Sequence, residues 1–298
     1  MPDLRWTLPI AAWSSTTTAA PKLDFIDPMV RRRLSTLSKM ALWVAHDCAP
    51  DHPQIRLIFA SRHGELARTT AILRDIEARE PVSPNAFSLS VLNAMSGIYG
   101  IARHDRSPAT AVAAGAETLG YALLEAHAQW TEDPSVPVLV VYADEPADAA
   151  YGHVEHEVTQ GALAILLDAR TNARGQLSIV VSDTDDEDDG DVSGDARARG
   201  DRHVGGDEHV SAPANDLDGN DTDAGGIDTG DDAREPRPTA SATQSEALLR
   251  CLESGQTQAW HCAGSSWQWS WIQDTRDAHD SHEAHETHTD RGPHVATA

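Results

Sequence analysis

Cysteines, aromatic residues and long apolar runs are all scarce in this chain of 298 residues. Its three cysteines, Cys48, Cys251 and Cys262, form no C-x-x-C pair and leave an odd count, which predicts a reducing, cytoplasmic compartment. No apolar run approaches the roughly 20 residues that a membrane-spanning helix needs, so we expect no membrane span. The N-terminal lead, residues 1–20, has only a short apolar piece with Asp3 before it, which favours a solvated or edge-strand segment over a signal peptide.

Positive charge is scarce as well, because the formal net charge is −24. Two stretches hold most of the excess: residues 183–240 contain 19 acidic and 5 basic side chains, and residues 273–298 contain 6 acidic and 2 basic ones. Such Asp- and Gly-rich sequence cannot bury enough apolar surface to offset its ordering entropy. We therefore predict a disordered acidic insert at 183–243 and a disordered His/Asp-rich tail at 273–298. A chain of this charge is not expected to bind nucleic acid.

The rest of the chain, residues 21–182 and 244–272, alternates helix and strand patterns and is predicted to form one α/β domain. Apolar periodicity predicts helices over 28–48 and 65–79, and apolar runs predict buried strands over 55–60 and 136–145. Runs at 161–168 and 175–181 predict a hairpin that turns at Asn172. After the insert, residues 246–252 predict a short helix. Alternation then places Trp267, Trp269 and Trp271 on one face of a strand, packed in the core or at an edge, with an interface or a ligand platform as alternatives.

The stretch from Ser83 to Trp130 is where chemistry is expected. A turn at 83–85 leads into an apolar segment with small residues at Ala94, Ser96, Gly97 and Gly100, which would allow another backbone to approach closely. A strand-like piece then runs over 109–112, and a helix is predicted over 114–130. Turns of this strand-to-helix type are common places for a nucleophile.

The turn itself reads Thr110-Ala111-Val112-Ala113-Ala114-Gly115. It resembles T-A-C-A-x-G, the turn that carries the nucleophilic cysteine of β-ketoacyl synthases, and Val112 stands at the cysteine's position. Together with "VRRRLSTLSKMAL", "FASRHGEL", "SPNAFSLSVLNA" and "AWHCAGSSWQWSW", it is similar to the half-length, chain-length-factor-like β-ketoacyl synthase N-terminal-domain proteins. The resemblance covers residues 21 to about 181 and 244–272. It implies half of a thiolase-like fold, with a mixed sheet between helices.

The resemblance implies a subunit without catalysis of its own. A condensing enzyme needs a thiolate at a helix N-terminus and imidazoles that assist the decarboxylation. Val112 supplies no thiolate, and the second half of a full synthase, which by resemblance would bring paired histidines, is absent. Such a subunit would pair as a heterodimer with an active ketosynthase in fatty-acid or polyketide (aryl-polyene-type) biosynthesis. An acyl carrier protein would be a further partner, and no cofactor is expected.

The same resemblance nominates residues for contact with the partner or the acyl chain. Phe87, Ser90, Asn93, Gly97 and Val112 are the candidate interface or acyl-cavity residues, with internal helix packing as the alternative for the first four. Half of a two-domain scaffold is also expected to expose apolar surface that its missing domain would cover. A partner would bury that surface.

Two other functions remain open at this stage. The chain could be a condensing or acyl-transferring enzyme in which Cys48, Cys251 or Cys262 replaces the usual nucleophile, although His46 and Asp47 do not face Cys48 on a helix. It could instead be a self-associating binding protein whose acidic insert is the active part, although such low-complexity sequence more often serves as a solvating linker.

Several polar patterns have an ordinary explanation that we prefer to a functional one. We expect a turn histidine at His63, a solvated loop at Asp144 and Glu145 instead of a metal pair, and a dipole-complementing carboxylate at Glu117. The arginines at 31–33 are expected to mark a charged helix entrance instead of a site for a pantetheine phosphate. Histidines recur at 279, 282, 285 and 288, and we expect only adventitious metal binding there and no dedicated metal site.

Overall fold

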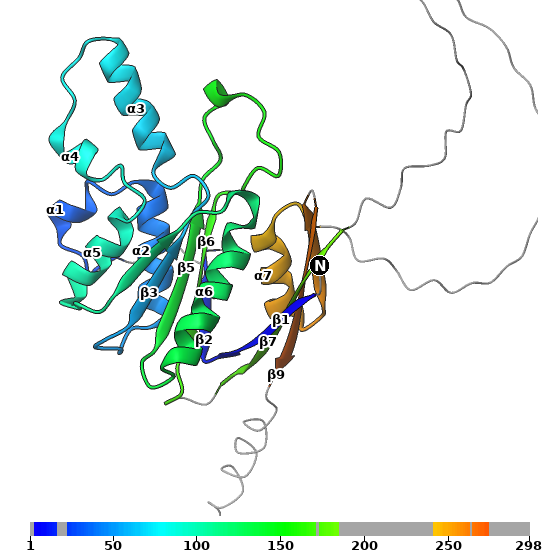
Figure 1. Ribbon diagram of the computed structural model, residues 1–298. Coiled ribbons are helices and arrows are strands. Elements are labelled where there is room, and N and C mark those ends of the chain that lie inside the picture. Colours follow the sequence, from blue (N-terminus) through cyan, green and yellow to red (C-terminus); the bar gives the residue numbers. More distant parts are fainter. Residues whose placement is uncertain (1–2, 17–22, 171–172, 185–240, 263, 274–298) are drawn as a thin grey trace, which may run out of the picture. The chain divides into compact units, whose positions relative to one another are not determined.

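Two β-sheets form the framework of the computed structural model, which describes residues 3–16, 23–170, 173–184, 241–262 and 264–273 (Figure 1). The first sheet has the strand order β2 (Ala12–Ser15), β6 (Gly161–Leu167), β5 (Val138–Asp144), β3 (Arg56–Ala60) and β4 (Ala109–Val112). It is mixed, because β3 is parallel to β4 and β5 whereas β6 is antiparallel to both of its neighbours. The second sheet is antiparallel, with the order β1 (Leu4–Ile10), β7 (Gly175–Asp183), β9 (Ser265–Gln273) and β8 (Gln258–Cys262).

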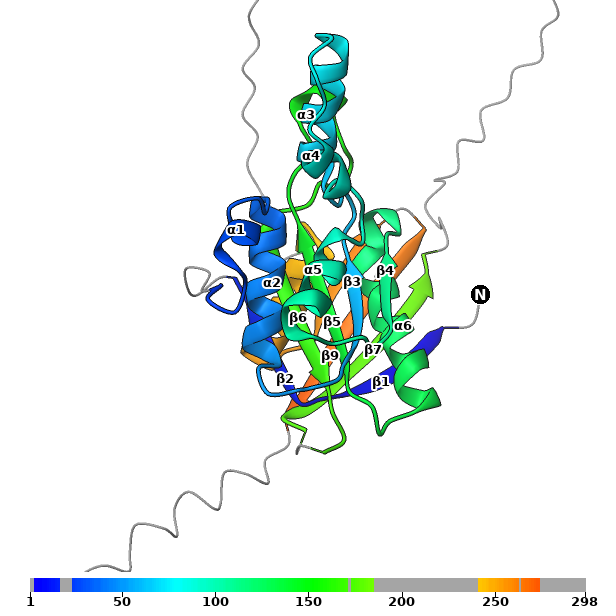
Figure 2. The ribbon, with the colours of Figure 1, turned by 90° about the vertical axis from the view of Figure 1, so that its left-hand side faces the viewer.

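Helices cover both faces of the mixed sheet. On one face lie α2 (Thr36–Cys48) and α5 (Ala94–Arg103), and on the other lies α6 (Thr118–Glu132), with α7 (Gln244–Ser254) between it and the second sheet (Figure 1). The short helices α1 (Pro28–Arg31) and α4 (Pro84–Ser88) flank the first pair. Figure 2 shows α3 (Leu66–Glu77) and α4 extending away from the strands. This layering explains why every residue of β5 is buried, since a strand covered on both faces has no solvent side.

Alternation along the central strand β3 divides the interior into two cores. Leu57 and Phe59 pack with α2 and α5, whereas Ile58 and Ala60 point toward α6. The α6 core is closed on its far side by the inner face of the second sheet. Side chains of that inner face alternate along each strand with outward-facing ones. The inward-facing side chains are Trp6, Leu8, Ile10, Leu177, Ile179, Trp260, Trp267 and Trp269.

The predicted strands at 161–168 and 175–181 exist, but the hairpin between them is wrong. β6 pairs with β2 and β5, whereas β7 pairs with β1 and β9. The N-terminal lead also runs from the second sheet to the first. Its strand β1 pairs with β7, its strand β2 pairs with β6, and only Ala11 separates them. Two neighbouring segments thus cross together from one sheet to the other, and local turn chemistry cannot reveal such a crossing. The lead supplies an edge strand to each sheet.

The helix predicted over 28–48 is interrupted. α1 ends at Arg31 and α2 begins at Thr36, because Ser35 forms a new N-cap whose hydroxyl accepts a 3.0 Å hydrogen bond from the Ser38 amide. The segment predicted from Phe87 is likewise divided between α4 and α5. The other predicted helices appear within four residues of their expected bounds as α3, α6 and α7, and Gly255 caps the C-terminus of α7 in the left-handed conformation.

The tryptophan strand is core, as expected. Trp267 and Trp269 are fully buried in β9 and stack with their ring centroids 6.3 Å apart. The opposite, outward face of β9 carries Ser266, Gln268 and Ser270. The predicted acidic insert and His/Asp-rich tail lie almost entirely outside the described residues. Among the helices that are described, none is long and apolar enough to cross a membrane.

Candidate functional site

The turn between β4 and α6 has the strand-to-helix geometry that the sequence predicts. β4 ends at Val112, Gly115 adopts a left-handed conformation with φ of 59°, and a single 3-10 turn over Gly115–Glu117 leads into α6. Val112 is half-buried, packs against the α6 core and accepts a 3.1 Å hydrogen bond from the Ser61 amide through its carbonyl oxygen. An isopropyl side chain at this place can neither attack a thioester nor carry an acyl group.

Glu117 occupies the entrance of α6 and is held by the second sheet. Its Oε1 accepts hydrogen bonds from Ser265 Oγ at 2.6 Å and from Trp267 Nε1 at 2.8 Å. Gly120 follows one turn later, where any Cβ would overlap the Trp267 ring. Glu117 therefore complements the helix dipole as predicted and also fastens the turn to β9. A carboxylate with these two partners is a structural anchor.

A buried hydrogen-bond network around Asp144 connects the carboxyl ends of β3 and β5. Asp144 is fully buried and accepts hydrogen bonds from Ser61 Oγ at 2.8 Å, from the Arg62 amide at 2.8 Å and from the His63 amide at 3.0 Å. Burial raises the pKa of the Asp144 carboxyl, although these hydrogen bonds oppose the rise. The expectation of a solvated loop is wrong for Asp144, which instead shapes the turn after β3.

His63 has a partner that the sequence did not identify. Its Nε2 lies 2.8 Å from Oε1 of Glu157, a residue 94 positions away in the loop that follows β5. Partial burial acts to raise the pKa of Glu157, but hydrogen bonds from His63 and from the amides of Val158 and Ala147 outweigh it and lower the pKa. Arg62 reinforces the contact by donating to the carbonyl oxygens of Glu155 and His156. The pair ties this loop to the turn after β3.

The five candidate interface or acyl-cavity residues fall on two sides of the mixed sheet. Phe87 lies on α4 with 65% of its surface exposed, and Gly97 lies on α5 with nothing within 4 Å of where a Cβ would stand. Asn93 is exposed at the start of α5, and Ser90 is half-buried with its hydroxyl bonded to the Phe87 carbonyl oxygen. Val112 packs against the opposite face. The structure brings the first four together and leaves Val112 apart from them.

Further exposed apolar side chains accompany Phe87. Val91 is 48% exposed before α5, and Ile101 is 77% exposed on its last turn. β4, which lies beside α5, is the edge of its sheet and pairs only with β3 among the described strands. We call this edge and these three exposed side chains together the accessible surface beside β4. Sequence periodicity cannot show their exposure, because α4 and α5 look like ordinary core helices.

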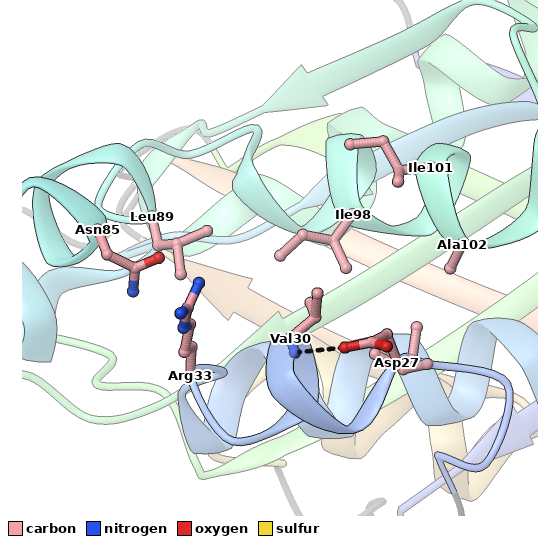
Figure 3. A pocket seen from close by; sticks show the side chains of 9 residues that line it. Asp27, Val30, Arg33, Asn85, Leu89, Ile98, Ile101 and Ala102 are labelled. Carbon is pink, nitrogen blue, oxygen red and sulfur yellow. Dashed lines mark hydrogen bonds between the residues drawn. The ribbon is translucent and has the colours of Figure 1, made fainter.

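A groove opens on the same helices. It has a volume of about 240 Å³ and lies between α1 and α5, with α4 at one end (Figure 3). Its wall is mainly apolar, with three polar side chains, and consists of Ile26, Asp27, Val30, Arg33, Asn85, Leu89, Ile98, Ile101 and Ala102. Of these residues the sequence patterns singled out only Arg33, as part of the arginine run at 31–33.

Two of the three cysteines are poorly placed for catalysis. Burial raises the pKa of Cys48 to about 12 and that of Cys251 to about 11, so neither holds a thiolate near neutral pH. Cys262 is half-buried in β8. Within the described ranges no group of three or more histidine, cysteine, aspartate or glutamate side chains could hold a metal ion. The histidines at 279–288 lie outside those ranges.

Comparison with known proteins gives a family and a fold. The model of the β-ketoacyl synthase, N-terminal domain, family matches residues 5–204, and no curated protein matches the chain. A solved ketosynthase (ApeO) in complex with its chain length factor (ApeC) from Xenorhabdus doucetiae is similar over 89% of this chain and 99% of that one, with 20% identity and a TM-score of 0.59. The ishigamide ketosynthase/chain length factor matches 61% of this chain and 68% of its own at 17% identity, with a TM-score of 0.46.

At such identities the likeness to solved structures is one of fold, and it confirms the predicted thiolase-like α/β architecture with a mixed sheet between helices. The family match rests on sequence and spans about two thirds of the 298 residues. Val112 occupies the turn where the resemblance places that family's cysteine. This chain therefore belongs to the β-ketoacyl synthase N-terminal domain family.

Proposed function

We propose that this chain is a non-catalytic, chain-length-factor-like subunit that pairs with an active β-ketoacyl synthase in fatty-acid or polyketide biosynthesis, of the aryl-polyene type. The observation that carries the proposal is Val112 in an otherwise intact strand-to-helix turn. The turn has a left-handed Gly115 and a helix after it, and Glu117 is bonded to Ser265 and Trp267, but Val112 stands where the resemblance places the cysteine. A scaffold retained without its nucleophile suits a role in binding.

The accessible surface beside β4 is the part of the molecule that best suits such a partner. An edge strand offers unpaired N–H and C=O groups to a second chain, and large apolar side chains beside it gain free energy when they are covered. Phe87, Val91 and Ile101 are such side chains. In this proposal Phe87, Ser90, Asn93 and Gly97 contact the ketosynthase, whereas Val112 packs against the α6 core on the other face of the sheet.

Co-expression with an active β-ketoacyl synthase from the same organism tests the proposal. Affinity capture followed by light scattering should return a one-to-one complex. A stable lone monomer or homodimer, found repeatedly under gentle conditions, would sink the idea. The same experiment with an acyl carrier protein added asks whether that protein joins the pair, which is the second partner in this proposal.

Two competing functions have direct tests. If a cysteine had replaced the nucleophile, incubation with an acyl-carrier thioester would leave an acyl adduct visible by intact mass. The raised pKa values of Cys48 and Cys251 predict no adduct at these two residues. If the acidic insert were the binding element, deleting residues 186–237 would abolish capture of the ketosynthase. We expect capture to survive that deletion, because β7 and α7 are left whole.

A further inference from the structure

His46 lies in the last turn of α2, the helix that covers the face of the mixed sheet opposite to Val112. One face of its imidazole stacks on Phe25, in the segment 23–27 before α1, with the ring centroids 4.0 Å apart and the planes at 19°. At the edge of the ring, Nδ1 lies 3.3 Å from Nη1 of Arg103, the last residue of α5. The ring therefore links the segment before α1, α2 and α5.

The contact with Arg103 requires a neutral imidazole. A guanidinium has donors and no acceptor, so His46 Nδ1 must accept, which it can do only without a proton. The charged groups that act on the ring are Arg103 from α5, Asp47 from α2 and Asp51 from the turn after α2, and the segment before α1 adds the uncharged Phe25 ring. Partial burial and the Arg103 charge lower the pKa of His46 from its ordinary value of 6.5, although the two carboxylates oppose the fall. The ring is thus neutral near pH 7.

Arg103 is held more firmly than the ring that it meets. Its Nη2 donates to the carbonyl oxygens of Pro50 at 3.1 Å and His52 at 2.6 Å, and its guanidinium lies over the Tyr99 ring, 5.3 Å from the centroid. Among the residues that the structure describes, the His46 imidazole makes no hydrogen bond or ring contact beyond the two already given. If the two side chains separate, the imidazole is therefore the group that moves.

Acid should break this contact. A second proton on the ring occupies Nδ1 and leaves two cations side by side. The imidazolium gains some attraction to the Phe25 ring, but like charges at 3.3 Å repel more strongly. His52, just after α2, differs because its Nε2 lies 2.8 Å from the Asp168 carboxylate, and a proton on the ring strengthens that pair. One histidine near this end of α2 therefore loses its partner in acid, and the other does not.

We propose that His46 is an acid-sensitive latch between the segment before α1 and the end of α5. In the neutral form its ring holds Phe25 against α5. In the protonated form it turns away from Arg103 and loosens residues 23–31, which include α1, a helix with no buried residue of its own. The latch goes beyond the proposed subunit function and is measured on the chain alone, so its failure would leave that function standing.

The direction of the pH effect follows from the protonation states. A histidine whose folded pKa is depressed stabilises the fold above its unfolded pKa of about 6.5. That contribution is lost as the pH falls from there through the folded pKa. We therefore expect the latch to be closed at about pH 7.5 and largely open at about pH 5.5.

Hydrogen-deuterium exchange of the full chain, read by mass spectrometry and corrected for the intrinsic effect of pH, tests the proposal. Between these two pH values the peptide covering residues 23–31 should lose protection severalfold, whereas residues 138–144 of β5 should keep theirs. Unchanged protection at 23–31, or an equal loss in β5, would overturn the proposal. This measurement on the unaltered chain stands even if a variant fails to fold.

Two variants assign the effect to the pair. His46→Gln keeps an acceptor for Arg103 and cannot take a proton, so its protection at 23–31 should not change with pH. Arg103→Gln removes the repelling charge and should reduce the loss. His104→Asn is the matched control, because His104 is the exposed residue directly after Arg103 and asparagine tolerates its left-handed backbone. It should lose protection as the unaltered chain does, and an equal loss in His46→Gln would show that another group carries the effect.

Discussion

Two exposed surfaces of this chain differ in the polarity of their side chains. The helical face, formed by α1, α4, α5 and Val91, exposes large apolar side chains: Met29 at 63%, Phe87 at 65%, Val91 at 48% and Ile101 at 77%. The outer sheet face, formed by the outward side chains of β1, β7 and β9, carries mainly polar groups, although the half-buried Val180 and the exposed Ile272 also lie on it. The polar groups are Thr7, Gln176, Ser178, Ser182, Ser266, Gln268 and Ser270. A sheet face of that kind is suited to water, and an apolar helix surface is suited to a partner.

This difference in polarity shows where the exposed apolar surface lies. Such a surface was expected because the chain resembles half of a two-domain scaffold. The C-terminal segment does not leave the α6 core bare, because α7, β8 and β9 close it with Trp260, Trp267 and Trp269. The outward side of that sheet is mainly polar instead, with Ile272 exposed near the end of β9. The uncovered apolar surface lies on the helical face, next to the β4 edge. In the proposed function, this is the surface that a second chain would cover.

The largest expected effect contrasts the two sides of β9. Trp269→Ala removes a fully buried ring beside Trp267 and should lower the free energy of unfolding by about 3–5 kcal/mol. Gln268→Ala, one residue earlier on the outer sheet face, should change it by less than about 0.5 kcal/mol. Urea denaturation followed by tryptophan fluorescence and circular dichroism measures both. Similar losses for the two variants would mean that the outer sheet face is covered after all.

The next effect contrasts the two faces directly. Phe87→Asp should weaken the complex with the ketosynthase by roughly 30-fold or more, since a buried aromatic anchor contributes about 2 kcal/mol or more at an interface. Ile272→Asp is the matched control, because Ile272 on β9 is exposed to the same 65% as Phe87. It should leave the affinity unchanged. Surface plasmon resonance with immobilised ketosynthase gives both values, and the reverse result would assign the partner to the second sheet.

Acid should lower the free energy of unfolding by protonating Asp168, a step that does not change the apolar contacts of the helical face. Burial acts to raise the pKa of Asp168, but hydrogen bonds from Arg170 and His52 outweigh it and lower the pKa to about 2. A carboxyl whose folded pKa is depressed stabilises the fold above its unfolded pKa of about 3.9, and that contribution is lost as the pH falls toward 2. We expect a loss of about 2 kcal/mol over this window.

Asp168→Asn removes the titrating group and serves as the reference for that measurement. It should be less stable than the unaltered chain at pH 7 and should approach it near pH 2, when thermal unfolding is followed across the range. Parallel curves at every pH would show that Asp168 has no such role. His52→Gln should reproduce part of the effect, because His52 Nε2 lies 2.8 Å from the Asp168 carboxylate.

Local chemistry made much of the fold predictable. The β4 turn, the helix after it and the buried strand β5 follow from short-range patterns, and each appears near its predicted bounds. Long-range pairing was not predictable in the same way. The segments 161–167 and 175–183 look like a hairpin. Only the pairing of β1 with β7 and of β2 with β6 shows that the chain changes from one sheet to the other there. Ser35 could have revealed the break before α2, since it is a good N-cap.

In the candidate site, too, local features were predictable from the sequence and long-range contacts were not. Val112 was predictable because one turn motif contains it. The partners of polar groups were not, since Glu157 is 94 residues from His63 and Ser265 is 148 residues from Glu117. The groove escaped notice for a related reason, because Ile98 and Ala102 have the spacing of an ordinary packed helix face. Exposure is a property of the assembled chain, and periodicity alone reports only that a face is apolar.

The smallest expected effect concerns the turn that lies between the two faces. Val112→Cys restores the family's residue, and we expect no acyl adduct and no condensation from it. The Glu117 carboxylate already occupies the entrance of α6, so the helix dipole that would favour a thiolate is partly offset. The new thiol should then keep a pKa near the ordinary value of about 8.5 and react with iodoacetamide no faster than a simple thiol.

A second substitution makes that last prediction sharper. Adding Glu117→Gln to Val112→Cys removes one negative charge from the start of α6 and should lower the thiol pKa by a fraction of a unit, in keeping with about 0.3–1 kcal/mol for a charge at a helix end. The pH dependence of alkylation, read by intact mass, measures the shift. An unchanged pKa would mean that Glu117 acts only as an anchor for Ser265 and Trp267. Acyl transfer by the single variant would instead show that the turn lacks nothing but its cysteine, and the subunit would then be a disarmed enzyme whose helical face is secondary to its chemistry.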